Sequence, residues 1–176
     1  SFVIGDRESD IAELFILAGK LSANILIRAS QDRYLNEENQ YLWAFFDKKS
    51  PVGQKTVFVP KIKNRDAREA ILEIKFAKVA LRRPWQSVKR HNMDRESISM
   101  YAILLKEINA PDNIEPLEWL LLTNIPVTNY DEACEKIEWY KKRWMIENFH
   151  KVLKSGCTVE KCRLETKERI ERYIAL

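Results

Sequence analysis

The sequence predicts a mixed α/β domain whose middle part is rich in β-strands. Apolar runs at residues 2–4 and 24–28 flank an amphipathic stretch, which is the pattern of a strand–helix–strand unit. Between residues 56 and 123 several strand-like runs follow one another without a helical pattern between them. A long segment with helical periodicity comes next. These observations predict an α/β sheet with an antiparallel, β-rich insertion.

The first unit begins with a buried strand at residues 2–4 that ends at a glycine turn. Ser9 or Asp10 is expected to cap the following helix, and Gly19 is expected to end it. The second strand covers residues 24–28. The helix is expected to cover Ile11, Leu14, Phe15, Leu17 and Ala18.

Four further strands are expected in the middle of the chain, and the last of them should be buried on both faces. They cover residues 56–59, 72–79, 98–105 and 119–123. The long helix that follows is expected to be capped by Thr128, Asn129 or Asp131, and Gly156 stands where a C-terminal glycine belongs.

Composition limits the classes of protein to which the chain can belong. With 45% hydrophobic and 32% charged residues, the 176 residues can bury one core. No apolar run approaches the roughly 20 residues of a membrane span, and the early charge of Asp6 does not fit a signal peptide. A cytosolic protein is expected. The three cysteines, of which Cys157 and Cys162 lie close together, lack a second Cys or His pair at zinc spacing, so free thiols are expected.

The charge is unevenly distributed, although the net charge is only +4. Residues 75–95 contain seven basic residues and one acid, whereas residues 107–135 contain seven acids and no Lys or Arg. The basic segment includes Arg82-Arg83-Pro84-Trp85 and could follow a phosphate backbone. A solvated strand face explains the same charges equally well, so charge alone does not decide the function.

Four polar residues of the long helix share one narrow arc. With about 100° per residue and Tyr140 at zero, Arg143, Lys154 and Glu147 fall at about 300°, 320° and 340°. The opposite face is apolar. A carboxylate can hold a divalent metal, and Arg, Lys and a phenol can hold phosphate oxygens. The simpler alternative is a solvent-facing strip with an Arg143–Glu147 pair at i, i+4. His150 lies near the arc and is expected to be a polar neighbour, because Mg²⁺ prefers oxygen ligands.

The spacing Tyr140-x2-Arg143-x3-Glu147-x6-Lys154 resembles the Y-R-E-K signature of bacterial insertion-sequence DDE transposases, the group that includes the transposase of transposon Tn-five. Arg143-Trp144-x2-Glu147-x-Phe149-His150-Lys151 is similar to the family's sequence around its catalytic glutamate. The residue after it, Asn148, departs from the acid often found there. The resemblance extends over nearly the whole chain.

Three residues in the first two thirds of the chain take their expected roles from this resemblance. Asp6, in Asp6-Arg7-Glu8-Ser9-Asp10-Ile11, resembles the family's second catalytic aspartate at a strand end. Arg28 resembles a strand-end arginine that contacts the DNA backbone. Trp119 resembles the insertion tryptophan that stacks on a flipped base. Without the family, these three would be a turn residue, a surface arginine and a core residue.

The resemblance implies an RNase H-like, retroviral-integrase-like α/β core in residues 1–30 and 126–176, with the β-rich insertion in residues 31–125. Asp6 and Glu147 would hold two Mg²⁺ or Mn²⁺ ions together with a first aspartate, which the family places upstream of anything in this chain, so the chain alone is expected to be inactive. Arg28, Trp119, Tyr140, Arg143 and Lys154 would contact DNA.

The resemblance further implies cleavage, hairpin formation and strand transfer at transposon ends in double-stranded DNA. The enzyme would work as a homodimer in the bacterial cytoplasm, at the nucleoid. Two alternatives stay open. One is a DNA-binding derivative without catalysis, either domesticated or a truncated inhibitor. The other is an RNase H-like nuclease that cuts DNA and joins nothing.

Overall fold

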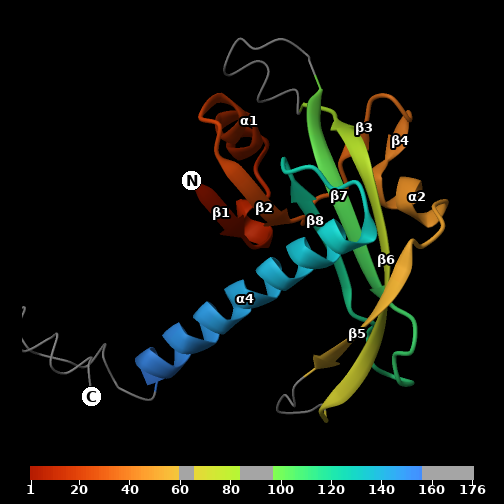
Figure 1. Cartoon of the computed structure of the whole chain (residues 1–176), viewed down its shortest axis with the longest axis vertical. Coiled ribbons are helices and arrows are strands. Elements are labelled where there is room, and N and C mark those ends of the chain that lie inside the picture. Colours follow the sequence, from red (N-terminus) through yellow and green to blue (C-terminus); the bar gives the residue numbers. More distant parts are fainter. Residues whose placement is uncertain (60–65, 84–96, 156–176) are drawn as a thin grey trace, which may run out of the picture. The chain divides into compact units, whose positions relative to one another are not determined.

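The computed structural model describes residues 1–59, 66–83 and 97–155, with side chains as far as residue 143. Figure 1 shows the described elements in chain order. They are β1 (Phe2–Gly5), the 3-10 helix η1 (Arg7–Ser9), α1 (Ala12–Lys20), β2 (Asn24–Arg28), β3 (Tyr34–Leu35), β4 (Gln40–Tyr41), α2 (Leu42–Asp47), β5 (Gly53–Val59), β6 (Arg68–Leu81), β7 (Ile98–Glu107), β8 (Glu118–Thr123) and α4 (Tyr130–Ser155).

The described strands form one mixed sheet in the order β1-β2-β8-β7-β6-β3-β4, with β5 paired to β6. Strands β1 and β2 are parallel, as expected for a strand–helix–strand unit. The remaining pairs are antiparallel, and the longest runs from Leu72↔Glu107 to Leu81↔Ile98 between β6 and β7. The expected α/β class and its antiparallel middle are therefore confirmed.

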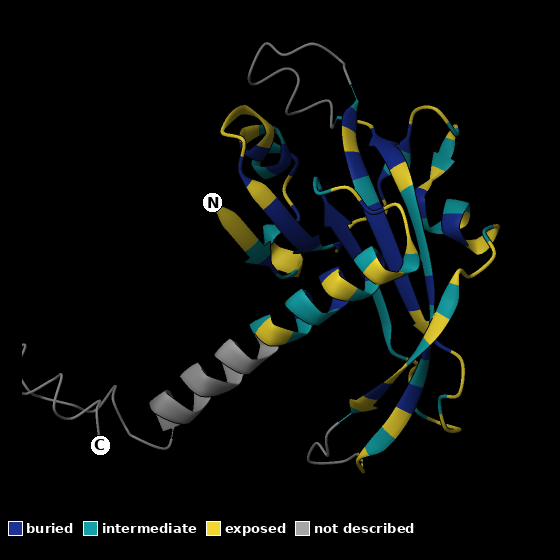
Figure 2. Ribbon diagram, viewed as in Figure 1, coloured by how far each residue is buried: buried dark blue, intermediate teal, exposed yellow. Residues whose placement is uncertain are grey.

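One face of the sheet carries the main hydrophobic core, to which helices α1 and α2 contribute (Figure 2). The alternation of strand side chains puts Ile25 and Ile27 of β2 on the same face as Leu120 and Leu122 of β8. The opposite side of these strands is also buried. Leu26 and Leu121 are 0% exposed, so β8 is buried on both faces as predicted.

Two predictions for the first helix are wrong. Neither Ser9 nor Asp10 caps α1, because the N-cap position belongs to Ile11, which makes no side-chain hydrogen bond. The helix also continues through Gly19. Among the apolar residues that the helix was expected to cover, Ile11 and Leu17 are 49% and 50% exposed. The Asp10 carboxylate does not cap α1 because it accepts hydrogen bonds from the segment after β2, and the helix begins after Asp10.

Three short elements had not been expected. Strands β3 and β4 have two residues each, and Leu35 of β3 pairs with Leu81 of β6. Helix α2 has six residues, and it buries Leu42 and Phe46 completely. Elements this short have no visible period, so their conformation depends on tertiary pairing more than on local pattern.

Helix α4 is the long helix that the sequence predicts, and Asn129 is its cap. The Asn129 Oδ1 accepts a hydrogen bond from the backbone N–H of Glu132 at 2.9 Å. The Glu132 carboxylate accepts in return from the backbone N–H of Thr128 at 2.7 Å, and this hydrogen bond lowers the pKa of Glu132. The predicted C-terminal glycine, Gly156, lies outside the described residues.

The first turn of α4 is joined to β5 by Tyr130. The phenol O–H donates to the backbone oxygen of Gln54 at 2.6 Å. A Cβ at Gly53 would lie 2.5 Å from Cε2 of Tyr130, so this ring requires the absence of a side chain there. A hydrogen bond with the Cys134 thiol, aided by burial, raises the pKa of Tyr130. Cys134 is a half-buried free thiol, as expected.

The chain divides into two compact units, residues 1–136 and residues 137–176. The first contains the sheet, α1, α2 and residues 130–136 of α4, and the second begins within α4. In the part of the chain that the structure describes, no helix has the length and apolar character needed to cross a membrane.

Candidate functional site

Asp6 lies directly after β1, where the chain turns into η1. Its Oδ1 accepts a hydrogen bond from the backbone N–H of Glu8 at 3.0 Å, and it is the N-cap of this 3-10 turn. The side chain is half-buried. The placement agrees with the expected strand-end aspartate, and the capping role of the simpler interpretation is present as well.

The turn after Asp6 folds closely over the end of β1. A Cβ at Gly5 would lie 2.4 Å from Cβ of Ser9 and 2.7 Å from Cδ1 of Ile27. The backbone N–H of Ser9 donates to the backbone oxygen of Asp6 at 3.2 Å. The missing side chain at Gly5 therefore lets the turn that carries Asp6 approach the strand end.

Arg28 is the last residue of β2, the strand parallel to β1. Register pairs run from Phe2↔Asn24 to Gly5↔Ile27, so Asp6 and Arg28 are the next residues beyond the last pair. Neighbouring strands lie about 4.8 Å apart. The carboxyl ends of parallel strands meet at one edge of a sheet, and both residues stand at this edge.

Trp119 belongs to β8, which pairs with the other side of β2. Arg28 faces Leu121 in the register, and Trp119 is two residues further along the same face of β8. The Arg28 Cζ lies 5.8 Å from the centroid of the Trp119 ring, and an Arg28 terminal nitrogen donates to the backbone oxygen of Glu118 at 3.2 Å. Trp119 is half-buried, neither fully core nor fully exposed.

Strand order and register thus place Asp6, Arg28 and Trp119 at one sheet edge, although they lie far apart in the sequence. We call them the strand-edge group. The group combines a carboxylate, a guanidinium and an indole that are each partly accessible. A metal ligand, a phosphate contact and a stacking surface are the functions open to these side chains.

The second set of predicted residues lies on α4 in the other unit. Tyr140 is 6% exposed and Arg143 is half-buried, with the Arg143 Cζ 5.7 Å from the centroid of the Tyr140 ring. The burial of Tyr140 contradicts the simple alternative of a wholly solvent-facing strip. Glu147 and Lys154 also lie within α4, as predicted, but their side chains, like that of His150, are outside the described part.

The described part of the chain does not by itself contain a complete metal site. Among the side chains that the structure describes, no three His, Cys, Asp or Glu residues lie close enough together to hold an ion. Asp6 is suited to supply one hard oxygen ligand for Mg²⁺ or Mn²⁺, because its carboxylate is half-buried and anchored through a backbone N–H.

The predicted basic segment is only partly described. Lys78 is exposed, whereas the Lys75 Nζ donates to the backbone oxygen of Phe46 at 2.9 Å. Arg82 is exposed and its Cζ lies 5.5 Å from the centroid of the Tyr34 ring. Residues 84–96 lie outside the described part, so the suggested path for a phosphate backbone stays a prediction.

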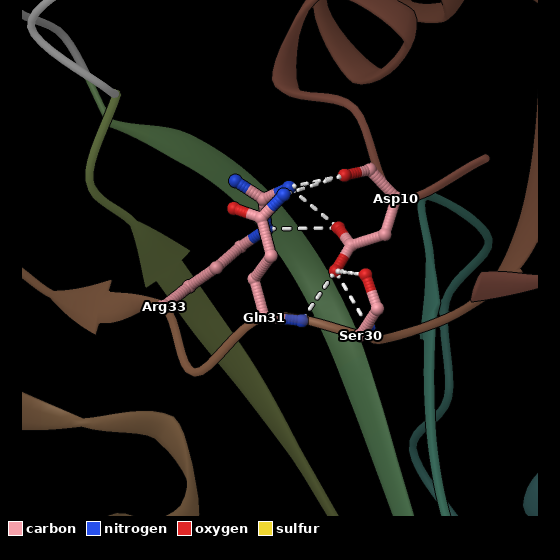
Figure 3. Close-up of polar contacts among 4 residues, drawn as sticks. All are labelled: Asp10, Ser30, Gln31 and Arg33. Carbon is pink, nitrogen blue, oxygen red and sulfur yellow. Dashed lines mark hydrogen bonds and ion pairs between the residues drawn. The ribbon is translucent and has the colours of Figure 1, made fainter. Parts of the chain in front are cut away.

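One buried acid near the strand-edge group has a role that sequence spacing did not indicate. Asp10 is 2% exposed, and its carboxylate bonds to Arg33 and to the backbone of Ser30 and Gln31 (Figure 3). The available signal was an acid followed by a helix, which favours a cap. Its true partners lie 20 to 23 positions away.

A second buried acid, Glu107, lies on the β-rich part of the sheet. Its Oε1 and Oε2 accept from Arg68 at 3.0 and 2.7 Å, and Oε2 also accepts from the backbone N–H of Leu117 at 2.8 Å. The hydrogen bonds from Arg68 lower the pKa of Glu107, and the same contact raises that of Arg68.

A comparison with known protein families identifies the chain. The family model described as the transposase DDE domain matches residues 2–176, which is nearly the whole sequence. Transposases act on DNA, and DDE enzymes use divalent metal ions, which suits a strand-end carboxylate with an arginine beside it. With the sheet-rich α/β fold in agreement, the chain belongs to the transposase DDE domain family.

Proposed function

We propose that this chain is the catalytic-core portion of a cut-and-paste DNA transposase of the Y-R-E-K group. In this proposal residues 1–30 and 126–176 belong to an RNase H-like core, and residues 31–125 form its β-rich insertion. The reaction is metal-dependent DNA strand cleavage, followed by hairpin formation and strand transfer. The observation that carries the proposal is the convergence of Asp6, Arg28 and Trp119 at one sheet edge.

Asp6 and Glu147 are the proposed metal ligands in this chain, with a third carboxylate supplied by the same protein outside these residues. Two Mg²⁺ or Mn²⁺ ions, when bound, would activate the attacking oxygen and stabilise the leaving oxygen. Support comes from the position of Asp6 at a strand end and of Glu147 on α4 in the spacing of the signature. Carboxylate oxygens are the ligands that these hard cations prefer.

The remaining residues hold the DNA in this proposal. Arg28 donates a hydrogen bond to the backbone oxygen of Glu118, the first residue of β8. This bond holds its guanidinium at the sheet edge, where it is proposed to contact a phosphate. Trp119 offers a half-accessible ring for stacking on an unpaired base, with about 1–3 kcal/mol available per base. Tyr140, Arg143 and Lys154 are proposed to orient the scissile phosphate from α4, which is a positioning effect.

The direct test is substitution of the two proposed ligands in the transposase that carries this chain. Asp6→Asn and Glu147→Gln keep size and remove charge. A metal site contributes several kcal/mol of transition-state stabilisation, so we expect single-strand nicking at transposon ends to fall about a thousandfold or more. Affinity for end DNA, measured by fluorescence anisotropy, should stay within about twofold, because neither carboxylate binds phosphate directly.

Two neighbouring acids provide matched controls. Glu8→Gln changes an exposed acid in the same turn as Asp6, and Glu138→Gln changes an acid of α4 that pairs with Lys141. Both controls should nick at the wild-type rate. Normal nicking by Asp6→Asn or Glu147→Gln would remove that residue from the metal site. A wild-type protein that binds ends without nicking would instead favour the non-catalytic derivative, and nicking without strand joining would favour a nuclease.

A further inference from the structure

Asp10 lies where the segment after β1 meets the segment after β2. Its Oδ2 accepts from the backbone N–H groups of Ser30 at 2.8 Å and Gln31 at 2.9 Å (Figure 3). The Ser30 hydroxyl adds a longer bond of 3.3 Å. Ser30 and Gln31 are the second and third residues after Arg28, and Asp10 is the fourth after Asp6. One carboxylate therefore joins the two segments that carry Asp6 and Arg28.

Arg33 holds this carboxylate from its other side. The Arg33 Nε donates to Oδ1 of Asp10 at 3.0 Å, and a terminal nitrogen donates to the same oxygen at 2.5 Å and to the Asp10 backbone oxygen at 2.9 Å. Both side chains are almost completely buried, at 0% exposed for Asp10 and 5% for Arg33. The Arg33 Cζ also lies 5.1 Å from the centroid of the Phe15 ring in α1. The orientation of the carboxylate is thus fixed by several directional contacts.

A buried ion pair of this kind contributes little net stability to a fold. Well-packed apolar residues of similar volume often stabilise a protein as much or more, because desolvation of two charges offsets their attraction. What the pair supplies in addition is direction, since a hydrogen bond weakens steeply as its angle departs from linear. In this chain that direction sets the spacing between two segments at the candidate site.

We propose that Asp10, held by Arg33, is a positioning residue that keeps Asp6 in register with the end of β2 that carries Arg28. This inference rests on the proposed function. Residues 6–10 also form local hydrogen bonds. The backbone N–H of Glu8 donates to the Asp6 carboxylate, and the backbone N–H of Asp10 donates to the backbone oxygen of Arg7. These contacts shape the turn without tying it to β2. The Asp10 carboxylate makes that connection, together with a hydrogen bond of 3.2 Å from the Gln31 side-chain amide to the Asp10 backbone oxygen. It therefore acts on the proposed metal ligand through the backbone.

The test compares two neutralised ion pairs in the transposase that carries this chain. Asp10→Asn/Arg33→Met, which we call the clamp variant, removes both charges of the Asp10–Arg33 pair and leaves no uncompensated charge in the core. Glu107→Gln/Arg68→Met does the same to the second buried pair, which lies in the β-rich part of the sheet. Thermal melting gives the Tm of each variant. Nicking kinetics and Mn²⁺ affinity, the latter by electron paramagnetic resonance, are then measured for each variant at the same temperature interval below its own Tm.

The clamp variant should lose about tenfold to a hundredfold in kcat, because displacement of a reacting group by about 1 Å has an effect of this size. Its Mn²⁺ affinity should fall about tenfold, as happens when residues that orient metal ligands are lost. Its KM for end DNA should change less than about threefold, since phosphate contacts determine that affinity. The matched variant should keep kcat and Mn²⁺ affinity within about twofold, because its ion pair lies in the β-rich part of the sheet and binds the loop between β7 and β8.

Equal kcat and Mn²⁺ affinity in the clamp variant and the wild type would overturn the inference, and so would equal losses in both variants. A clamp variant that does not fold is replaced by Arg33→Lys, which keeps the charge and removes the fork geometry. Arg33→Lys should lower kcat relative to Arg68→Lys by the same factor that separates the two double variants. The proposed function fails separately, if wild type does not nick or if Asp6→Asn nicks normally. The inference fails alone if Asp6→Asn is inactive and the clamp variants are fully active.

Discussion

Two arginine–carboxylate pairs with fully buried carboxylates look alike as pairs but connect different parts of the fold. Both carboxylates are 0% exposed and both arginines bind through Nε and a terminal nitrogen. The Asp10 carboxylate also accepts from two backbone N–H groups after β2, beside the strand-edge group. Glu107 accepts from one, that of Leu117, within the loop between β7 and β8.

The difference shows how the surroundings of an ion pair decide its role. Trp119 is held by strand pairing in addition to the contact of Glu107 with Leu117, because six register pairs hold β8 against β7, from Tyr101↔Thr123 to Lys106↔Glu118. By contrast, β1 pairs only with β2 among the described strands, and its register pairs end at Gly5. The turn that carries Asp6 therefore depends on side-chain contacts for its placement. The Asp10 pair stabilises a geometry at the candidate site, and the Glu107 pair stabilises the β-rich part.

The largest effect should come from removal of one acid at a time. Asp10→Ala leaves the charge of Arg33 buried and unpaired, so the free energy of unfolding should fall by about 3–5 kcal/mol. Glu107→Ala should lower it by about 2 kcal/mol, because the Arg68 side chain is 13% exposed and can turn its charge toward water. Urea unfolding at neutral pH measures both. An equal or larger effect of Glu107→Ala would contradict this ranking.

Acid should weaken the Glu107 pair in a predictable direction. Hydrogen bonds from Arg68 lower the pKa of Glu107 in the folded state. A lowered folded-state pKa stabilises the protein above the unfolded value of about 4.3, and this contribution disappears as the pH falls through the folded-state pKa. The stability difference between wild type and Glu107→Gln should thus be constant near neutrality and shrink below about pH 4. A difference that is the same at pH 7 and pH 3 would remove the pair as its cause.

Regular elements were predictable because their patterns are local. The apolar runs of β2, β7 and β8 and the cap and periodicity of α4 each occupy one continuous stretch of sequence. Strands β3 and β4 were missed because two residues show no period, and β3 is joined to the rest of the sheet through the distant pair Leu35↔Leu81. Asp10 was assigned to a helix cap for the same reason, since nothing near it in the sequence indicates Arg33.

The candidate site was predictable from the resemblance and only partly from the residues themselves. Asp6 by itself favours a turn residue, and the structure does give it a capping bond. Trp119 by itself favours a core residue, but it is half-buried against Arg28. Spacing on one helix could place Tyr140 and Arg143 together, because both belong to one regular element. The convergence of Arg28 and Trp119 depends on strand pairing, which sequence spacing does not contain.

The central claim is that Asp6 and Glu147 bind the same metal site, and a double-mutant cycle on Mn²⁺ affinity tests it most directly. Electron paramagnetic resonance would measure the Kd of Mn²⁺ for wild type, Asp6→Asn, Glu147→Gln and the double variant of the transposase that carries this chain. We predict that each single substitution weakens binding about tenfold or more and that the double variant is little weaker than either single one, because groups that act as a unit are not additive. Unchanged affinity in either single variant, or losses that simply add in the double variant, would contradict a shared site.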